Sequence, residues 1–499
     1  MSLEAELNRV GSELAGPRRE QRPAGDAGDL ILALDQGGHA SRAILFDTTG
    51  RDVAEAQVPV ATCRIGPDRV EHDADELVTS LRIAAQDVCD SVAARGREIV
   101  AAGLACQRST VVCWDRSDGR ALSAALSWQD RRDAGFLERL RPRAEWVRQR
   151  TGLVLSPHYG ANKLRWCLER LPAVRTAATA NRLAAGPLSS FLLCRLLEER
   201  PVCVDPSNAA RTLLFDPATQ DWVPELLDIF GVPASALPQP VPTLHTYGTL
   251  RIGARDIPFR ACTGDQAAAV FAHGELDPDQ AWLNAGTGAF LQRAITAAAR
   301  PVDGLLKSVL FSDGSRVVCS LEGTVNGAAS ALDWLQSRVV LDVGRAVQAL
   351  RGPAPAHAPL FINGVGGLGS PWWKPDFPIE FCGDGEELER VIAVVESMAF
   401  MISFNLELMR DSGPLAALVI TGGLARSDYL CQAVADLTTV PVDRPELREA
   451  TARGTAFLAA GRPAHWQAPA LERRFAPAAG GVLAARSRDW RAEMSRRGA

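Results

Sequence analysis

The feature that most constrains the fold of this chain is a unit of two strands joined by a glycine turn, and the unit occurs twice. The first copy is the apolar run 30–34, which ends at Asp35 and is followed by Gly37-Gly38 and a second strand. The second copy is the run 281–284, which leads into Gly286-Thr287-Gly288. Helical patterns and further strands follow each copy, so the sequence predicts two α/β halves.

The length of the chain also indicates two domains. A single hydrophobic core stops growing well before 499 residues. The proline-rich segment 237–243 lies between the two halves and predicts a boundary near residue 250. The predicted organisation is a flexible N-terminal extension (1–29), an N-terminal domain (30–250), a C-terminal domain (251–462) and a C-terminal extension (463–499), which is either a surface segment or a helix that packs back on the body.

Short turns and helical spacing define the elements of the first half. Strands are predicted at 30–34, 41–47 and 54–60, and their glycine-containing connections indicate an antiparallel meander. Leu77, Leu81, Ala84 and Val88 recur at helical spacing and predict a helix over 75–94 that stops at Gly96. A further strand is predicted at 99–106.

The second half repeats this alternation of strands and helices. Residues 317–321 are predicted as a strand that precedes a helix over 326–336. The segment 394–409 predicts a buried core helix, in which methionines fill gaps between larger side chains. A buried strand at 415–421 meets Gly422-Gly423, and a helix is expected to follow from about Ser427.

Composition narrows the class of protein. Hydrophobic residues make up 47% of the chain and charged residues 23%, as in an ordinary globular protein. The net charge of −5 argues against a nucleic-acid partner, and no uncharged apolar stretch reaches 18 residues, so we expect no membrane insertion. The polar start predicts no secretory signal, and the 11 cysteines contain no CxxC pair. A cytoplasmic location is therefore expected, since scattered thiols are typical of a reducing compartment.

The first glycine turn has two interpretations. Backbone amides in a tight turn can converge on an anion, and Asp35 at its mouth can hold a hydrated magnesium ion. The alternative is a hairpin turn in which an aspartate only caps a strand. His39 in this turn either reaches a phosphate or is a surface residue. Short motifs of this kind do not decide between such alternatives.

Two more glycine turns follow apolar strands in the second half. The turn Gly286-Thr287-Gly288 can present a hydroxyl and backbone amides to a phosphate. Gly422 and Gly423 end a strand and precede a helix, which suits the close approach of a nucleotide. Three such turns, spread over two halves, indicate that one nucleotide binds between them.

One carboxylate fits the chemistry of a kinase. A kinase that phosphorylates a hydroxyl needs a carboxylate that accepts the proton and orients the oxygen. Asp265, in Gly264-Asp265-Gln266 ahead of an alanine-rich segment, fits this role. The alternative is that Asp265 is the N-cap of the following helix.

Taken in order, these segments resemble one protein family. The matching pieces run from about residue 30 to about residue 462, and they are Leu34-Asp35-Gln36-Gly37, Ser41 to Asp47, Val70 to Asp73, Gln107-Arg108, Ser127 to Arg132, Thr151-Gly152-Leu153, Lys163 with Trp166, Asn208 to Phe215, Gly264-Asp265-Gln266, Gly286-Thr287-Gly288, Leu321-Glu322-Gly323, Gly367 to Trp373, Gly422-Gly423, Arg444-Pro445-Glu446 and Gly454-Thr455-Ala456. This series resembles the FGGY family of carbohydrate kinases, and within it the glycerol kinases most closely.

The resemblance implies an α/β fold of two RNase-H-like, actin-like ATPase domains with an active-site cleft between them. It implies ATP and Mg²⁺ as cofactors, a small polyol or sugar as substrate, and a homo-oligomer as a state that many relatives adopt. By matching positions, the catalytic base would be Asp265, and the metal ligands would be Asp35 and Asp265. The substrate would contact Arg108, Ser109, Trp128, His158, Asp265 and Gln266, and ATP would contact Gly37, Gly38, His39, Arg42, Gly286, Thr287, Gly422 and Gly423.

Four positions depart from the glycerol kinase pattern. Ser109 stands where a glutamate follows the Gln-Arg pair, and His158 stands where a tyrosine is usual, although Tyr159 is adjacent. Gly38 and His39 replace two hydroxyl residues of the phosphate loop. The leading hypothesis is an ATP-dependent kinase of a polyol such as glycerol. Ser109 and His158 motivate a ketose or sugar-alcohol kinase as an alternative, and the altered loop motivates a degenerate sensor that binds nucleotide or polyol without turnover.

Overall fold

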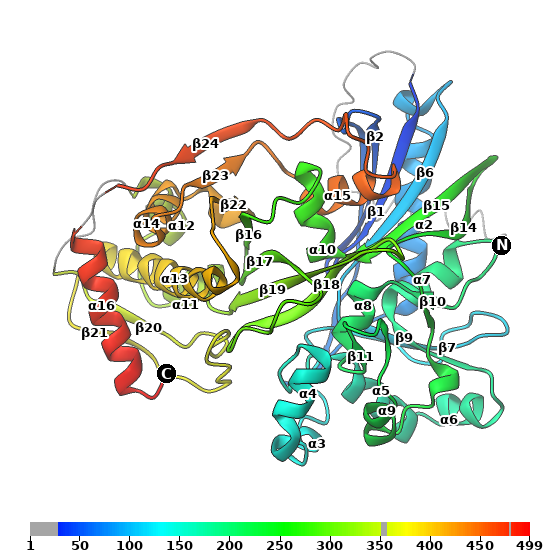
Figure 1. Cartoon of the computed structure of the whole chain (residues 1–499), viewed down its shortest axis with the longest axis horizontal. Coiled ribbons are helices and arrows are strands. Elements are labelled where there is room, and N and C mark those ends of the chain that lie inside the picture. The colour runs from blue at the N-terminus through cyan, green and yellow to red at the C-terminus, as the bar shows by residue number, and fades with distance from the viewer. Residues whose placement is uncertain (1–27, 351–356, 479–480) are drawn as a thin grey trace. The chain divides into compact units, whose positions relative to one another are not determined.

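The computed structural model describes residues 28–350, 357–478 and 481–499, which form two compact units (Figure 1). Unit 1 comprises residues 28–275, Ser308–Cys319 and Glu449–Ala468. Unit 2 comprises the described residues of Leu276–Lys307, Ser320–Arg448 and Pro469–Ala499. The predicted N-terminal extension, 1–29, lies outside the described residues except for Gly28 and Asp29.

The predicted boundary near residue 250 falls inside strand β14 (Leu244–Ile252). β14 pairs antiparallel with β15 (Arg255–Gly264), and β15 pairs with β6 (Ile99–Cys106) in the same sheet. The compact units therefore separate after Glu275, because these strand pairs hold residues 244–264 in the first sheet. The proline-rich segment that motivated the boundary precedes this hairpin and does not end the domain.

The main sheet of unit 1 has the strand order β14-β15-β6-β1-β2-β3. β1 (Leu30–Gln36), β2 (Ala40–Asp47) and β3 (Asp52–Pro59) form the predicted antiparallel meander. β6 runs parallel to β1, and β15 runs parallel to β6. Three adjacent parallel strands therefore end at the same edge of the sheet.

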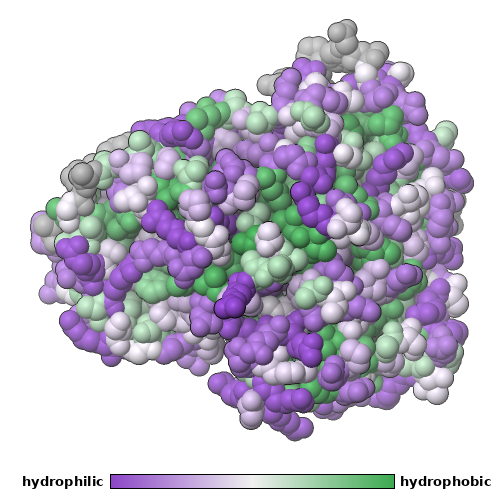
Figure 2. All heavy atoms as spheres, viewed as in Figure 1, coloured by the Kyte–Doolittle hydropathy of each residue, from purple (hydrophilic) through white to green (hydrophobic). Residues whose placement is uncertain are grey.

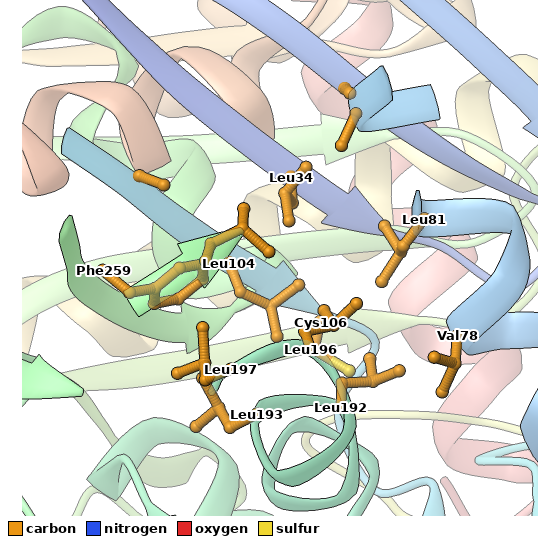
Figure 3. Close-up of a cluster of buried hydrophobic side chains, with 14 of the residues drawn as sticks. Leu34, Val78, Leu81, Leu104, Cys106, Leu192, Leu193, Leu196, Leu197 and Phe259 are labelled. Carbon is orange, nitrogen blue, oxygen red and sulfur yellow. The ribbon is translucent and has the colours of Figure 1, made fainter. Parts of the chain in front are cut away.

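Helices cover both faces of this sheet. α2 (Ala74–Cys89) and α7 (Leu188–Leu196) pack on the face that carries Leu34 and Leu104, and the buried side chains of this cluster interlock in Figure 3. α15 (Ala450–Ala459) covers the other face, where a Cβ on Gly103 would lie 3.1 Å from the Thr455 methyl carbon. Successive residues of a strand point to opposite faces, so Leu104 faces α2 and α7 while Gly103 faces α15.

The predicted helix over 75–94 ends earlier than expected. α2 stops at Cys89, and Asp90 closes its last turn through a backbone hydrogen bond to Gln86. Ser91 then takes an extended conformation, and residues Val92–Ala94 form a separate 3-10 turn. The apolar residues at helical spacing therefore continue past the end of the helix at Cys89.

A smaller sheet of unit 1 has the strand order β4-β5-β8-β7-β9. These strands are β4 (Cys63–Ile65), β5 (Arg69–His72), β7 (Val111–Asp115), β8 (Ala125–Leu126) and β9 (Leu183–Pro187). α5 (Gly160–Arg170) packs against β7. The remaining described helices and strands of unit 1 are α3 (Gly135–Glu138), α4 (Ala144–Thr151), α6 (Pro172–Thr179), α8 (Pro206–Ala209), α9 (Pro224–Phe230), α10 (Asp265–Val270), β10 (Cys203–Val204), β11 (Phe215–Asp216), β12 (Asp221–Trp222) and β13 (Gln239–Pro240).

A second, seven-stranded sheet repeats the order of the first sheet. Its strands, in the order β18-β19-β17-β16-β22-β23-β24, are β18 (Leu306–Ser312), β19 (Val317–Val325), β17 (Ala289–Thr296), β16 (Gln280–Ala285), β22 (Ala417–Thr421), β23 (Val442–Pro445) and β24 (Leu471–Phe475). β16 pairs antiparallel with β17 and parallel with β22, as β1 pairs antiparallel with β2 and parallel with β6. β20 (Leu360–Asn363) and β21 (Ile379–Cys382) form a separate ladder.

The helices of unit 2 are α11 (Ala329–Gln336), α12 (Val343–Ala349), α13 (Glu387–Met409), α14 (Asp428–Thr438) and α16 (Gly481–Arg496). α11 begins three residues later than the predicted start at Asn326, because Ala328 has non-helical angles (φ −99°, ψ −107°). Among the described residues, one stretch, Glu387–Ser412, has the length and hydropathy of a membrane span. Its most apolar window is 83% buried, which is typical of a core helix.

The C-terminal extension contains a helix that packs back on its own unit. α16 contacts β20 and α13, and Arg486 of α16 donates hydrogen bonds of 2.8 and 2.6 Å to the buried carboxylate of Glu396. Tyr429 donates to the same carboxylate at 2.8 Å, and the Trp490 indole donates to the Phe361 carbonyl at 3.0 Å.

Hydrophilic side chains make up much of the face shown in Figure 2, as on an ordinary protein surface.

The Arg486–Glu396 contact predicts an unequal cost for two substitutions on one helix. Arg486→Ala leaves a buried carboxylate without its cation, and we expect the free energy of unfolding to fall by about 3 kcal/mol. Arg491→Ala, also on α16, removes a partly exposed pair with Glu407 of α13 and should cost less than about 1 kcal/mol. Urea denaturation of the two variants measures both values. Equal losses would contradict the role assigned to Arg486.

Candidate active site

The predicted site residues of unit 1 gather where the three parallel strands end. In the sheet register, Gln36 of β1 and Gly264 of β15 both pair with Cys106 of β6. The turn after β1, the loop after β6 and the start of α10 therefore lie at one edge of the sheet. Ligands bind outside the carboxyl ends of parallel strands in many open α/β sheets.

The turn between β1 and β2 is tight and carries a buried carboxylate. Gly37 donates its N–H to the Ala40 carbonyl at 3.0 Å, and Arg42 Nη1 lies 3.5 Å from Asp35 Oδ2. Burial, together with the nearby carboxylates of Asp265 and Glu449, raises the pKa of Asp35 to about 7 against the lowering effect of Arg42. The ionised form of Asp35 is therefore one that a bound cation would stabilise.

The loop after β6 brings an arginine across the start of α10. Arg108 is buried, and its Nε lies 3.9 Å from Asp265 Oδ1. A Cβ on Gly264 would lie 2.5 Å from Arg108 Cδ, so only glycine leaves room for the arginine side chain. Gly264 of the predicted Gly-Asp-Gln motif thus has a packing role beside the carboxylate.

Asp265 is the first residue of α10, and Gly264 holds the N-cap position. The N-cap interpretation of Asp265 is therefore wrong, although its Oδ1 does accept the backbone N–H of Gln266 at 2.7 Å. This bond fixes one carboxylate oxygen at the helix start. Asp265 and Gln266 are both half-buried.

Trp128 and His158 lie beside each other. His158 Nδ1 lies 3.0 Å from the Trp128 carbonyl, which assigns the proton to Nδ1 and leaves Nε2 as an acceptor in the neutral ring. Burial lowers the pKa of His158, which favours this neutral form. The Trp128 side chain is 39% exposed. Tyr159 is buried, and the Arg211 guanidinium lies over its ring.

Ser109 and the phosphate-loop residues complete the set in unit 1. Ser109 is buried and has a left-handed backbone (φ 66°). A Cβ on Gly38 would lie 3.8 Å from the Trp128 Nε1 atom, so the first glycine turn lies against a predicted substrate residue. The His39 side chain is exposed.

The contacts of two residues at this edge, Gln107 and Glu449, were not predicted from the sequence. The Gln107 amide donates to the Gly37 carbonyl at 3.2 Å and accepts from the Thr110 hydroxyl at 3.1 Å. Glu449 approaches Arg42, with a separation of 3.8 Å between Oε2 and Nε. Gln107 belongs to a matched motif, so its position offered a signal, whereas nothing near Glu449 in the sequence marks it.

The glycine turns of unit 2 also lie at the ends of adjacent parallel strands. Asn284 of β16 pairs with Thr421 of β22, so Gly286 and Gly422 follow neighbouring strand ends. Gly422 has φ 90°, and a Cβ there would lie 2.5 Å from the Ala285 carbonyl oxygen, so glycine is required. A Cβ added to Gly423 would have no other heavy atom within 4 Å, so the space beside this glycine is open.

The start of α11 holds the Gly286–Thr287 turn in place. The Ala329 N–H donates to the Gly286 carbonyl at 3.0 Å, and the Ser330 N–H donates to the Thr287 carbonyl at 3.1 Å. The Thr287 side chain is exposed. The predicted phosphate-contacting residues of this half therefore stand on a turn with a fixed backbone.

The carboxylates fit a magnesium ion better than a metal that protein side chains surround. No group of three or more His, Cys, Asp or Glu residues suited to a metal occurs in the described part of the chain. Asp35 and Asp265 interact electrostatically at the sheet edge. Mg²⁺ takes one or two carboxylates and completes its shell with water and phosphate oxygens, so this pair is sufficient.

Comparisons with known proteins agree with the topology. The family models of the FGGY family of carbohydrate kinases match residues 30–272 (N-terminal domain) and 281–461 (C-terminal domain). A glycerol kinase from Methylobacterium nodulans is 34% identical over 481 residues, which cover 91% of this chain and 95% of the relative.

Two solved structures show the same fold. The crystal structure of Plasmodium falciparum glycerol kinase with ADP has a TM-score of 0.87 at 21% identity and covers 95% of this chain and 99% of its own. A xylulose kinase from Rhodospirillum rubrum has a TM-score of 0.82 at 21% identity and covers 94% and 98%. These likenesses confirm the predicted α/β, actin-like fold, while the position of the site between two domains stays a prediction. The chain therefore belongs to the FGGY family of carbohydrate kinases, and it is an ATP-dependent kinase of a sugar or polyol.

Proposed function

We propose that the protein transfers the γ-phosphoryl group of ATP to a hydroxyl of a small polyol or sugar, with Asp265 as general base. The observation that carries this proposal is the placement of Asp265 beside Arg108 and near Asp35 at one sheet edge. The relatives named glycerol kinase make glycerol the first acceptor to test.

In this mechanism Asp265 accepts the proton of the acceptor hydroxyl while that oxygen bonds to the γ-phosphorus of ATP, and the bond from this phosphorus to the β,γ-bridging oxygen breaks and releases ADP. The Gln266 N–H orients the carboxylate through Oδ1, and the positive charge of Arg108 stabilises its ionised form. Arg108, Trp128, His158 and Gln266 bind and orient the acceptor, since positioning supplies much of the catalysis in phosphoryl transfer. Mg²⁺, held by Asp35 and Asp265, would neutralise charge on the phosphate oxygens.

The ATP phosphates bind to backbone amides and hydroxyls in both units in this proposal. Gly37, Gly38 and Arg42 contribute from unit 1, with His39 as the residue nearest to solvent. Gly286 and Thr287 contribute from unit 2, and Gly422 and Gly423 line the adenine pocket. The open space beside Gly423 leaves room for a ligand to approach the backbone there.

A ketose or a longer sugar alcohol is the second candidate acceptor. Ser109 supplies a short hydroxyl where a glutamate carboxylate would accept hydrogen bonds from two hydroxyls, and His158 supplies a single ring nitrogen in place of a phenol. Unpaired buried polar groups cost about 1–3 kcal/mol each, so the set of hydroxyls on the acceptor must match these side chains.

A panel of acceptors tests the proposed function. ADP release by the purified protein is measured with magnesium and ATP, across glycerol, erythritol, pentitols, pentuloses and hexuloses. Turnover on one or a few of them identifies the acceptor class. ATP binding without turnover on any acceptor would instead support the hypothesis of a degenerate sensor.

Asp265→Asn should lower kcat by about 10²- to 10⁴-fold while ATP binding changes little, because the amide cannot accept the proton. Steady-state kinetics and nucleotide titration measure the two effects. Asp256→Asn, an exposed aspartate on the strand that leads to Asp265, is the matched control and should keep full activity. An unchanged kcat in Asp265→Asn would remove the general-base role.

Ser109→Glu should raise the activity on glycerol relative to the preferred acceptor, because it restores a carboxylate that accepts two hydroxyl hydrogen bonds. The kcat/KM ratio for the two acceptors measures this change. Ser109→Gln has the same size without the charge and should give a smaller gain. No change in the ratio would mean that residue 109 does not face the acceptor.

Asp35→Asn should raise the Mg²⁺ concentration that gives half-maximal activity by about tenfold or more, because it removes one anionic ligand. Activity is measured over a magnesium series at saturating ATP and acceptor. Asp47→Asn, at the far end of the same hairpin, is the control and should leave the magnesium response unchanged. A parallel response of both variants would contradict the metal role of Asp35.

A further inference from the structure

Lys163 has an unusual environment for a lysine. It is one of three lysines in the chain, beside Lys307 and Lys374, and its side chain is fully buried on α5 in unit 1. Lysine is seldom fully buried unless it is paired. Asp130, the carboxylate whose charge raises the pKa of Lys163, is already bonded to Arg132 at 2.8 Å and to the Val70 N–H at 2.8 Å. Lys163 is therefore not held there by an ion pair of its own.

The Lys163 ammonium instead donates to three backbone carbonyls. Nζ lies 2.9 Å from the Ser109 carbonyl oxygen, 2.7 Å from that of Ser127 and 2.7 Å from that of His158. An ammonium has three N–H bonds, so this arrangement uses all of them. Burial lowers the pKa of Lys163 to about 7, and the negative charge of Asp130 opposes this effect. Only the protonated form supplies a donor to each of the three carbonyl oxygens.

The three carbonyls belong to three segments that are far apart in the sequence. Ser109 lies between β6 and β7, Ser127 lies between β8 and Trp128, and His158 precedes α5. We call residues 109–110, 127–128 and 158 the acceptor segments, because they contain three of the side chains proposed to bind the acceptor. Direct contacts also join them: His158 Nδ1 reaches the Trp128 carbonyl, and the Trp128 N–H donates to the Thr110 hydroxyl at 3.0 Å.

One acceptor segment needs such support. Ser109 has a left-handed backbone, which costs a non-glycine residue about 1–2 kcal/mol and persists only where the surroundings impose it. The bond from Lys163 is made to the carbonyl of this same residue. Arginine would not replace Lys163, because a planar guanidinium does not point three N–H bonds from one nitrogen at converging oxygens.

We propose that Lys163 is a positioning residue that holds the three acceptor segments in one arrangement and so sets the affinity for the acceptor without contacting it. The inference rests on the proposed function for its kinetic consequence, but not for the contacts themselves. A buried ammonium stabilises a fold poorly compared with an apolar side chain, so its value here lies in the geometry that it imposes.

The test compares wild-type protein with Lys163→Met, which keeps the length of the side chain and removes its donors. Hydrogen–deuterium exchange by mass spectrometry should show faster exchange in all three acceptor segments together, by about fivefold or more, while β1 and α13 remain protected. With the acceptor that the wild type uses, KM for the acceptor should rise about tenfold or more, and KM for ATP should stay within about twofold.

Lys307→Met is the matched control. Lys307 also donates to two backbone carbonyls, those of Ala297 and Ala299, but it lies in unit 2. This variant should leave the acceptor segments protected and KM for the acceptor unchanged. Lys163→Gln retains two N–H donors and should give intermediate values, which also provides a variant for measurement if Lys163→Met does not fold.

Three results would overturn the proposal. These are unchanged exchange in the acceptor segments of a folded Lys163 variant, faster exchange in α5 alone, and a fall in kcat with both KM values unchanged, which reports only a smaller folded fraction. Failure of the proposed function is distinguishable, because it appears as a wild type that turns over no acceptor. The exchange experiment still decides the positioning role in that case.

Discussion

The parallel pairing of β1, β6 and β15 is the constraint on which the site in unit 1 depends. Each strand places one proposed site residue at or just after its carboxyl end: Asp35, Arg108 and Asp265. A slip of one residue in any pair would turn these side chains to the opposite face of the sheet. Leu30, Leu32 and Leu34 all belong to one hydrophobic cluster on the face under α2 and α7, which fixes the orientation of β1, so the hydrophobic core also sets the position of the proposed site residues.

Close approach to the backbone at two glycines also helps to position the residues of this site. Gly264 lets the Arg108 side chain cross the start of α10, and Gly103 lets α15 lie against β6. Both glycines have ordinary negative φ values, so their role is to leave space and not to permit an unusual backbone. The site therefore rests on small residues inside the sheet as much as on the charged residues that would do the chemistry.

The sequence predicted the strands well and the ends of helices poorly. β1, β2 and β6 follow from apolar runs bounded by glycines, since such runs leave few alternatives. The end of α2 at Cys89 could not be seen, because residues 90–94 continue its helical pattern. The set Asp35, Arg108 and Asp265 could be proposed from matched motifs, whereas the approach of Glu449 to Arg42 depends on residues about 400 apart in the chain and no local pattern encodes it.

The role of Lys163 shows a different limit of sequence reasoning. A lysine in a matched motif suggests a ligand contact, yet here its donors are all used by main-chain oxygens. Side chains at positions 109 and 158 depart from the glycerol kinase pattern, while the carbonyls of the same residues are held by one ammonium. An acceptor site built in this way separates two tasks: backbone contacts fix where the segments lie, and side chains decide which hydroxyls they recognise. Under the proposed function, we expect substitutions at positions 109 and 158 to change the preferred acceptor without moving the backbone that carries these side chains.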